Sequence, residues 1–264
     1  MTTTAPPVCV ALDVPGMAEA LEIVQELSGL IPLFKIGLEL FCAEGTSTVQ
    51  AVRDAGAEVF LDLKVHDIPR TAAAAVREAG RIGAAYLTIH GFGGRDMIRA
   101  AAETSQEHGG PQLLVVTVLT SLDDTRLAEV GVNSTVREHA LRIGRLAAEE
   151  GAGGLVLSPR ELDVVRPALP HLQLCTPGVR PAGHSVHDHQ RSLTPAEAVL
   201  AGADLLVVGR PVLQAPDRRA AAAAIVEQVR EAEGQREGLR PHDSAASVQE
   251  AEDAEFVQDG QGAT

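Results

Sequence analysis

The sequence predicts a single α/β domain folded as a (β/α)8 TIM barrel, because three of its features agree on this architecture. Strand-like and helix-like segments alternate eight times along the chain. The length of 264 residues suits one barrel, since such barrels run to roughly 200–250 residues as one domain. Hydrophobic residues make up 45% of the chain, yet only five Phe, one Tyr and no Trp are present. A core of small and branched aliphatic side chains is typical of parallel strands covered by helices.

Eight short apolar segments are predicted to form the parallel strands. In chain order they are Val8–Val14, Leu33–Leu40, Glu58–Val65, Tyr86–Phe92, Gln112–Thr120, Gly154–Ser158, Leu172–Val179 and Leu205–Arg210. An open, doubly wound sheet is the structural alternative. It needs a glycine-rich turn after the first strand, and the segment VALDVPGM lacks the G-x-G-x-x-G pattern. The closed barrel is therefore favoured.

Eight segments with apolar residues at helical spacing are predicted to form the helices between and after the strands. They are Met17–Leu30, Thr46–Ala55, Thr71–Ile82, Arg95–His108, a helix capped by Asn133 or Ser134 that ends near Glu150, Pro159–Arg166, a helix capped by Thr194 that ends at Leu200, and Asp217–Glu233. Two longer loops are expected, at Ser121–Val132 and at Arg180–Leu193.

The two ends of the chain differ in composition from the barrel, which we assign to residues 8–233. Residues 1–7 are predicted to be a flexible N-terminus. Residues 234–264 are polar, acidic and poor in branched apolar side chains, so we expect a disordered and dispensable acidic tail from Gly234 onward.

Charge, cysteine content and hydropathy indicate which partners and which cellular compartment to expect. A formal net charge of −14 argues against nucleic acid or an anionic membrane as partner, so an anionic substrate would need a local positive pocket. Cys9, Cys42 and Cys175 are too few and too far apart for a disulfide framework or a zinc site. The N-terminus lacks a signal-peptide pattern, and no uncharged apolar stretch reaches membrane-spanning length. We therefore predict a cytoplasmic protein.

The segment LDLKVHDIPRT, Leu61–Thr71, carries the most informative charges. In an alternating strand, Asp62 and Lys64 point to the same face. The strand ends near Asp67, because Pro69 cannot continue a sheet ladder. By its spacing, Asp67 does not face the same way as Asp62 and Lys64. Unpaired buried charges cost several kcal/mol, so charges in a buried strand persist only when they are paired or functional.

Charges at two neighbouring strands decide between a structural and a functional interpretation of this segment. An ordinary structural salt bridge would explain one Asp–Lys pair. Asp13 at the end of the first strand and Lys35 in the second add two charges at the same rim of the barrel. Because active sites of such barrels lie at the C-terminal ends of the strands, we predict a catalytic cluster without a metal.

The last two strands predict a phosphate site. Gly209 and Arg210 end the eighth strand, and Arg180 follows the seventh. Glycine lets backbone N–H groups approach a ligand, and arginine offers a bidentate fork to phosphate. Either arginine alone could be a solvated rim residue, but the two together at this place favour phosphate binding.

Histidines give weaker signals. The loop histidines His184, His187 and His189 resemble a metal cluster, which we do not favour because only Asp188 adds a carboxylate. His66 and His90 are predicted to be packing or hydrogen-bonding residues at the rim rather than acid–base catalysts.

Six segments in order resemble the orotidine 5'-phosphate decarboxylase family: ALDV, FKIGLELF, LDLKVHDIPRT, VTVLTSL, TPGVRP and VVGRPVLQA, which together cover Val8 to Ala215. The resemblance implies a homodimer with shared active sites that converts orotidine 5'-monophosphate to UMP without a cofactor. It implies that Lys64 stabilises and protonates a carbanion at C6, with Asp62 beside the departing carboxylate. It also implies that Asp67 reaches into the partner's site with Thr71 nearby.

The resemblance further implies how the substrate is bound. Lys35 and Asp13 would hold the ribose hydroxyls; Thr120, next to Ser121, would face the pyrimidine; and Arg180, Gly209 and Arg210 would hold the phosphate. The family has a glutamine in the loop after the seventh strand, usually in the order Asp-Gln-basic-Arg. Here the order is Asp188-His189-Gln190-Arg191. We favour Gln190 over His189 as the substrate contact, because an amide can both donate and accept.

Two other functions fit a barrel of this kind. Related enzymes acting on hexulose or ketogulonate phosphates use Mg²⁺ and carry a carboxylate at the second-strand position, where Lys35 would repel the ion. A catalytically silent phosphate-binding barrel would not need the buried Asp–Lys–Asp array. Both are less favoured than the decarboxylase.

Overall fold

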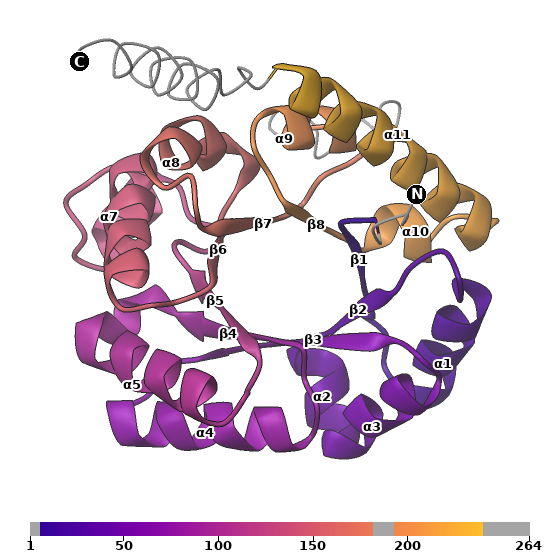
Figure 1. Ribbon diagram of the computed structural model, residues 1–264, viewed down its shortest axis with the longest axis horizontal. Coiled ribbons are helices and arrows are strands. Elements are labelled where there is room, and N and C mark those ends of the chain that lie inside the picture. The colour runs from indigo at the N-terminus through magenta and orange to yellow at the C-terminus, as the bar shows by residue number, and fades with distance from the viewer. Residues whose placement is uncertain (1–5, 182–192, 240–264) are drawn as a thin grey trace, which may run out of the picture.

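The computed structural model of the chain describes residues 6–181 and 193–239, and in them the predicted barrel is confirmed. Eight parallel strands pair in chain order, and the first pairs with the last, so the sheet closes on itself. Helices surround the barrel as an outer ring (Figure 1). The carboxyl ends of all eight strands therefore meet at one rim.

The strands begin within one residue of their predicted starts. They are β1 (Val8–Ala11), β2 (Leu33–Ile36), β3 (Glu58–Val65), β4 (Tyr86–His90), β5 (Gln112–Val116), β6 (Gly154–Val156), β7 (Gln173–Pro177) and β8 (Leu205–Val208). Only β3 keeps its predicted end among these eight. The others end two to four residues early, because their last predicted residues leave the ladder and form the rim.

The helices of the described residues include two short 3-10 turns. They are α1 (Met17–Glu26), α2 (Leu38–Glu44), α3 (Thr46–Asp54), α4 (Pro69–Arg81), η1 (Gly91–Gly93), α5 (Gly94–Glu107), α6 (Asp124–Glu129), α7 (Val136–Glu149), η2 (Pro159–Glu161), α8 (Leu162–Ala168), α9 (Pro195–Leu200), α10 (Arg210–Leu213) and α11 (Arg218–Leu239). Among these, no helix is long and apolar enough to cross a membrane.

Three short helices were not predicted. The predicted second strand was wrong beyond Ile36, since Gly37 breaks it and Leu38–Glu44 forms α2. The predicted loop Ser121–Val132 contains α6, which Asp123 caps by accepting a 2.9 Å hydrogen bond from the Arg126 N–H. Arg210, predicted to end the eighth strand, opens α10. Each of these helices is too short to show a full apolar period in the sequence.

Two caps test the predicted helix starts. Thr194 caps α9, as predicted, through a capping box with Glu197. The predicted cap of α7 was wrong: Thr135, and not Asn133 or Ser134, forms the capping box with Glu138. Thr135 is the cap because Glu138, three residues further on, can accept a hydrogen bond from the Thr135 N–H.

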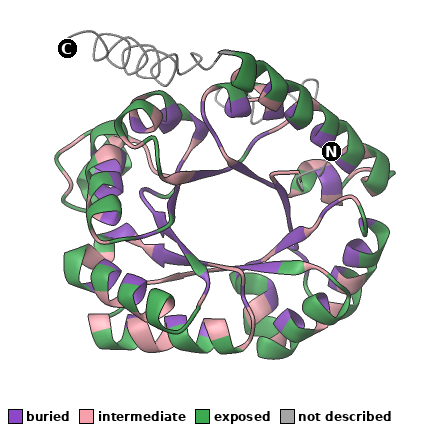
Figure 2. Cartoon of the chain, in the orientation of Figure 1, coloured by how far each residue is buried: buried purple, intermediate pink, exposed green. Residues whose placement is uncertain are grey.

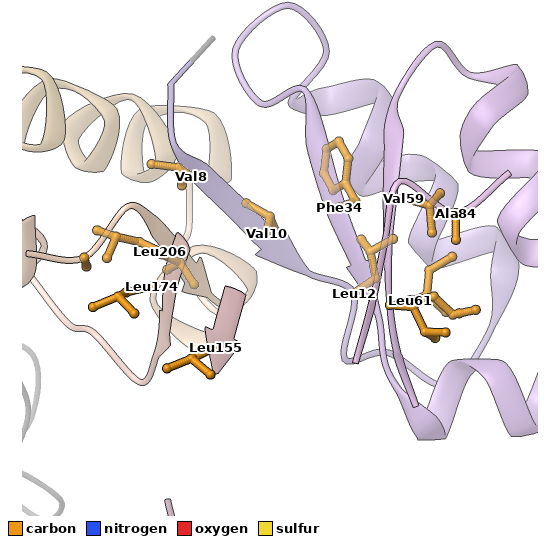
Figure 3. Close-up of a cluster of buried hydrophobic side chains, with 14 of the residues drawn as sticks. Val8, Val10, Leu12, Phe34, Val59, Leu61, Ala84, Leu155, Leu174 and Leu206 are labelled. Carbon is orange, nitrogen blue, oxygen red and sulfur yellow. The ribbon is translucent and has the colours of Figure 1, made fainter. Parts of the chain in front are cut away.

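Side chains that alternate along the strands divide the core into two layers. One layer lies inside the barrel and comprises Cys9, Ala11, Leu33, Phe60, Leu114, Cys175, Leu205 and Val207. The other lies between strands and helices and includes Val8, Val10, Phe34, Val59, Leu61, Leu155, Leu174 and Leu206 (Figure 3). Strands and inner helix faces are buried, and the outer helix faces are exposed (Figure 2). Aliphatic side chains thus make up most of both layers.

The ends of the described chain are attached to the barrel. The Leu206 N–H donates to the Pro7 carbonyl over 2.9 Å, so the part of the predicted flexible N-terminus that the structure describes is bound to β8. The last predicted helix was expected to end at Glu233, before the boundary at Gly234. This end was wrong, because α11 continues to Leu239. Arg236 stabilises the extra turn through a 2.8 Å hydrogen bond to the Ala203 carbonyl and a 3.5 Å contact with Asp204. Residues 240–264 lie outside the described residues.

A pair of truncations tests this boundary. A chain that ends after Leu239 is expected to keep its thermal stability, whereas one that ends after Gly234 should lose about 1–2 kcal/mol, because it lacks the charged hydrogen bonds of Arg236. Thermal unfolding of both truncations checks this. Arg236→Ala in the full chain should reproduce the loss. Equal melting temperatures for the two truncations would show that the last turn of α11 adds nothing.

Glu161 is a buried carboxyl group in η2, with 3% of the residue exposed. Its carboxylate accepts a 2.7 Å hydrogen bond from the Ser158 N–H. Burial outweighs this bond and the nearby Arg137, and it raises the pKa of Glu161 from 4.5 to about 7. The folded state therefore binds the proton more tightly than the unfolded state, and stability falls as pH rises from 4.5 to about 7.

Glu161→Gln should therefore stabilise the protein at pH above this window by about 1–3 kcal/mol, and by nothing at pH below it. Chemical unfolding at several pH values measures this. Glu197→Gln is the matched control in the capping box of α9. Hydrogen bonds from Thr194 lower the pKa of Glu197, so its loss should destabilise the protein above its usual pKa of 4.5. Parallel pH profiles for both variants would contradict the assignment.

Candidate active site

A cavity of about 310 Å³ opens at the C-terminal rim of the barrel. It brings together eight of the predicted site residues: Asp13, Lys35, Asp62, Lys64, Thr120, Arg180, Gly209 and Arg210. They come from or follow six different strands, β1, β2, β3, β5, β7 and β8. The closed sheet explains the convergence, since parallel strands bring all their carboxyl ends to the same rim.

Four side chains of alternating charge form a row across one wall of the cavity. Lys35 Nζ lies 3.2 Å from Asp13 Oδ1 and 3.5 Å from Asp62 Oδ2. Lys64 Nζ donates to both Asp62 oxygens over 2.9 Å. The order Asp13, Lys35, Asp62, Lys64 gives each inner charge a partner of opposite sign on both sides.

Burial increases along the middle of this row. The side chains of Lys35 and Asp62 are 11% and 14% exposed, against 57% for Asp13. Burial alone would raise the pKa of Asp62, but Lys35, Lys64 and a hydrogen bond from Thr88 lower it below its usual value. Burial would lower the pKa of Lys35, but Asp62 and Asp13 raise it. Both groups are therefore charged at neutral pH.

β3 departs from the predicted alternation at Lys64. Leu61 pairs with Leu87 and Val65 pairs with Ile89, so three residues of β3 stand opposite one residue of β4. In this bulge Lys64 has φ 51°, a left-handed conformation that no other non-glycine residue of the described chain adopts. Such bulges re-aim side chains near active sites. Lys64 thus reaches the cavity by a local distortion.

Thr88 is the site residue that sequence reasoning missed. It is fully buried in β4 and faces the bulge. Its hydroxyl donates to Asp62 Oδ1 over 2.9 Å and accepts from the Lys64 N–H over 2.8 Å. A threonine inside a strand gives no functional signal by itself, because threonine is common in strands.

Lys35 and Lys64 are the only two lysines in the 264-residue chain. All other fixed positive charges of side chains are arginines. Both lysines pair with the same carboxylate, that of Asp62. The site therefore contains every side-chain amine of the protein.

The two predicted arginines also line the cavity. Arg180 and Arg210 line it together with Gly209 and Thr120. The Arg180 N–H donates to the Leu193 carbonyl over 3.0 Å, which joins the two flanks of residues 182–192 at the cavity. Gln190 and His189, the two candidates in that segment, lie outside the described residues.

Two predicted residues do not line the cavity of this chain. Asp67 is exposed just before α4, and its carboxylate accepts a 2.7 Å hydrogen bond from the Ile68 N–H. Thr71 is exposed in the first turn of α4. The position of Asp67 away from Asp62 and Lys64 agrees with its predicted phase. Ser121 lies in an adjacent groove beside Thr120.

The floor of the cavity is apolar. Phe60, Val116, Val156, Cys175 and Val207 line it from inside the barrel. Burial raises the pKa of the Cys9 and Cys175 thiols, and both cysteines are free, as is the exposed Cys42. A flat apolar ring could rest on this floor while charged groups meet its substituents.

The rim histidines form a packed stack. The rings of His66 and His90 lie 5.4 Å apart at 20°, and His90 Nδ1 accepts from the Phe92 N–H over 3.3 Å. Neither lines the cavity, which agrees with the predicted packing role. Within residues 6–181 and 193–239, no group of three or more His, Cys, Asp or Glu could hold a metal ion. His184 and His187 lie outside these ranges.

Known proteins are similar to this chain in sequence and in fold. Residues 6–225 match the family described as orotidine 5'-phosphate decarboxylase / HUMPS family. The chain is 49% identical over 219 residues to an orotidine 5'-phosphate decarboxylase of Anaeromyxobacter sp. (strain K), covering 83% of this chain and 96% of that one. It is 45% identical over 239 residues to that of Thermobifida fusca (strain YX), with coverage of 90% and 99%. The crystal structure of the orotidine 5'-phosphate decarboxylase from Lactobacillus acidophilus superposes with a TM-score of 0.75 at 32% identity, covering 85% and 99%.

Proposed function

The chain belongs to the orotidine 5'-phosphate decarboxylase / HUMPS family, and from this premise we propose that it converts orotidine 5'-monophosphate to UMP and CO2 without a cofactor. This reaction completes the synthesis of UMP in pyrimidine biosynthesis. The observation that carries the proposal is the row of four alternating charges that ends on the Lys64 ammonium inside a cavity with an apolar floor.

The chemical step breaks the bond between C6 and the carboxylate carbon. The electron pair of that bond stays on C6 when CO2 departs, and no conjugated group of the ring accepts it. The Lys64 ammonium stabilises this carbanion electrostatically and then transfers a proton to C6. The resulting amine regains its proton from solvent. One positive group thus does both tasks, which explains why a metal or cofactor is not needed.

Asp62 supports this step in two ways. Its carboxylate lies 2.9 Å from Lys64 Nζ and holds the ammonium in position. Its own negative charge, maintained by Lys35 and Lys64, repels the substrate carboxylate and favours departure of neutral CO2. Because Asp62 is 14% exposed, water screens this repulsion weakly.

The remaining lining residues have roles in substrate binding. Arg180 and Arg210, with Gly209, bind the phosphate, which is the positive pocket required by a chain of net charge −14. Asp13 and Lys35 hold the ribose hydroxyls, and Thr120 faces the pyrimidine. Gln190 contacts base and phosphate from the segment whose flanks meet at Arg180.

The enzyme works as a homodimer with shared active sites. Asp67 and Thr71 do not line the cavity of their own chain and are exposed, together with Ile68, which is 66% exposed. A second copy packed on this rim would bury Ile68 and bring Asp67 to the Lys64 of its partner. The three free cysteines suit the reducing cytoplasm, where we place the protein.

A magnesium-dependent sugar-phosphate enzyme of the same family is the alternative, and Lys35 argues against it, because its ammonium occupies the wall where that metal would bind. An absorbance assay separates the two functions. With EDTA present, orotidine 5'-monophosphate should lose its orotate-type absorbance, whereas hexulose and ketogulonate phosphates should not react even with Mg²⁺. Turnover of a sugar phosphate with Mg²⁺, and none of the nucleotide, would replace the proposal.

A further inference from the structure

The β3 bulge has one partner on the neighbouring strand. Asp62, Leu63 and Lys64 stand opposite Thr88, between the regular pairs Leu61–Leu87 and Val65–Ile89. A bulge removes regular ladder hydrogen bonds, so the freed backbone groups need another partner. The Lys64 N–H finds it in the Thr88 hydroxyl at 2.8 Å.

The direction of the two hydrogen bonds at Thr88 follows from chemistry. The backbone N–H of Lys64 can only donate, so the hydroxyl oxygen of Thr88 accepts from it. The single hydroxyl hydrogen is then available for Asp62 Oδ1 at 2.9 Å, a carboxylate oxygen that can only accept while ionised. Thr88 is fully buried, so water does not replace either bond. One hydroxyl therefore joins the backbone of Lys64 to the carboxylate that binds its ammonium.

We propose that Thr88 is a positioning residue, whose hydroxyl holds Lys64 in its left-handed conformation and fixes Asp62 so that the ammonium is aimed at the reacting carbon. Thr88 does not line the cavity and does not touch the substrate space. It acts through both members of the Asp62–Lys64 pair at once. The inference rests on the proposed decarboxylation for its kinetic consequence, but the two hydrogen bonds can be tested without substrate.

The kinetic test compares Thr88→Val with Thr88→Ser. Valine keeps the shape and removes the hydroxyl, and kcat should fall roughly tenfold to a hundredfold with little change in KM, because the reacting groups are misplaced while the binding groups remain. Serine keeps the hydroxyl and should restore most of kcat. Loss of the hydrogen bond to Asp62 also destabilises the ionised form of that carboxyl group, so the acid limb of the kcat profile should move to higher pH in Thr88→Val alone.

Thr176→Val is the matched control. Thr176 is a fully buried threonine of β7 whose hydroxyl has no hydrogen-bond partner among the residues that the structure describes, and it does not line the cavity. Its replacement should leave kcat and the pH profile unchanged. If Thr88→Val does not fold, Thr88→Ala and Thr88→Ser make the same comparison, because they differ only in the hydroxyl.

A measurement without substrate separates this inference from the proposed function. Because the chain has only two lysines, ¹⁵N-lysine labelling gives backbone amide signals from Lys35 and Lys64 alone. Hydrogen exchange at the Lys64 amide should accelerate by roughly tenfold or more in Thr88→Val and return in Thr88→Ser, while Lys35 stays unchanged. Unchanged exchange and an unshifted pH profile would overturn the inference even if the wild type decarboxylates the nucleotide. Accelerated exchange in Thr88→Val, found together with a wild type that does not decarboxylate the nucleotide, would support the inference and contradict the proposed function.

Discussion

Lys64→Ala should abolish turnover and leave the fold intact. The variant loses both electrostatic stabilisation of the carbanion and its proton donor, which together are expected to be worth about 10⁴-fold or more in kcat. The only other lysine, Lys35, lies between Asp13 and Asp62 and does not replace it. Alanine also has a Cβ, so the left-handed backbone at this position carries the same strain as before. Steady-state kinetics and thermal unfolding measure the two effects separately.

Lys64→Arg is the informative companion to this variant. A guanidinium keeps the positive charge but does not give up a proton near neutral pH. It should therefore recover part of the electrostatic effect and little of the turnover. Near-normal kcat in Lys64→Ala, with orotidine 5'-monophosphate consumed at the wild-type rate, would remove Lys64 from its role.

Two inactive variants, Lys64→Ala and Asp67→Ala, should regain activity when mixed. If Asp67 acts in the partner's site, a heterodimer collects both substitutions in one site and none in the other. Random exchange of equal amounts makes half of the dimers heterodimers, so about a quarter of all sites become intact. The exposure of Asp67 outside the cavity of its own chain motivates this expectation.

The complementation needs a check on subunit exchange. Mass measurement or a fluorescent label on one variant shows when heterodimers have formed. A mixture of Lys64→Ala with Asp62→Ala is the matched control, because each substitution disables the site of its own chain, so both sites of every heterodimer should stay inactive. If exchange is complete and the first mixture is no more active than its components, Asp67 acts within its own chain.

The sequence was sufficient to predict the barrel and most of the polar residues that line its cavity, for two physical reasons. Strand starts follow from apolar runs that the closed sheet buries, and all eight starts lie within one residue of the prediction. Residues at the ends of parallel strands must share one rim. Asp13, Lys35 and Asp62 therefore meet although they are far apart in the chain.

The parts that could not be predicted depend on contacts between strands. The left-handed Lys64 arises from a register shift between β3 and β4, and Thr88 matters because it faces that shift. Neither is visible in one strand alone. The last turn of α11 depends in the same way on Arg236, which contacts residues more than thirty positions earlier in the chain. Local composition around Gly234 predicted that the helix ends there, but α11 continues to Leu239.

One reaction in D2O tests the central claim, that a carbanion at C6 forms without a metal and receives its proton from an exchangeable acid of the protein. Lys64 exchanges its ammonium protons with solvent, so orotidine 5'-monophosphate treated with the wild-type protein in D2O and EDTA should give UMP with one deuterium at C6. Proton NMR of the product would show the C6 signal lost and the C5 signal reduced to a singlet. Hydrogen retained at C6, or substrate that stays unchanged until a metal is supplied, would contradict the account.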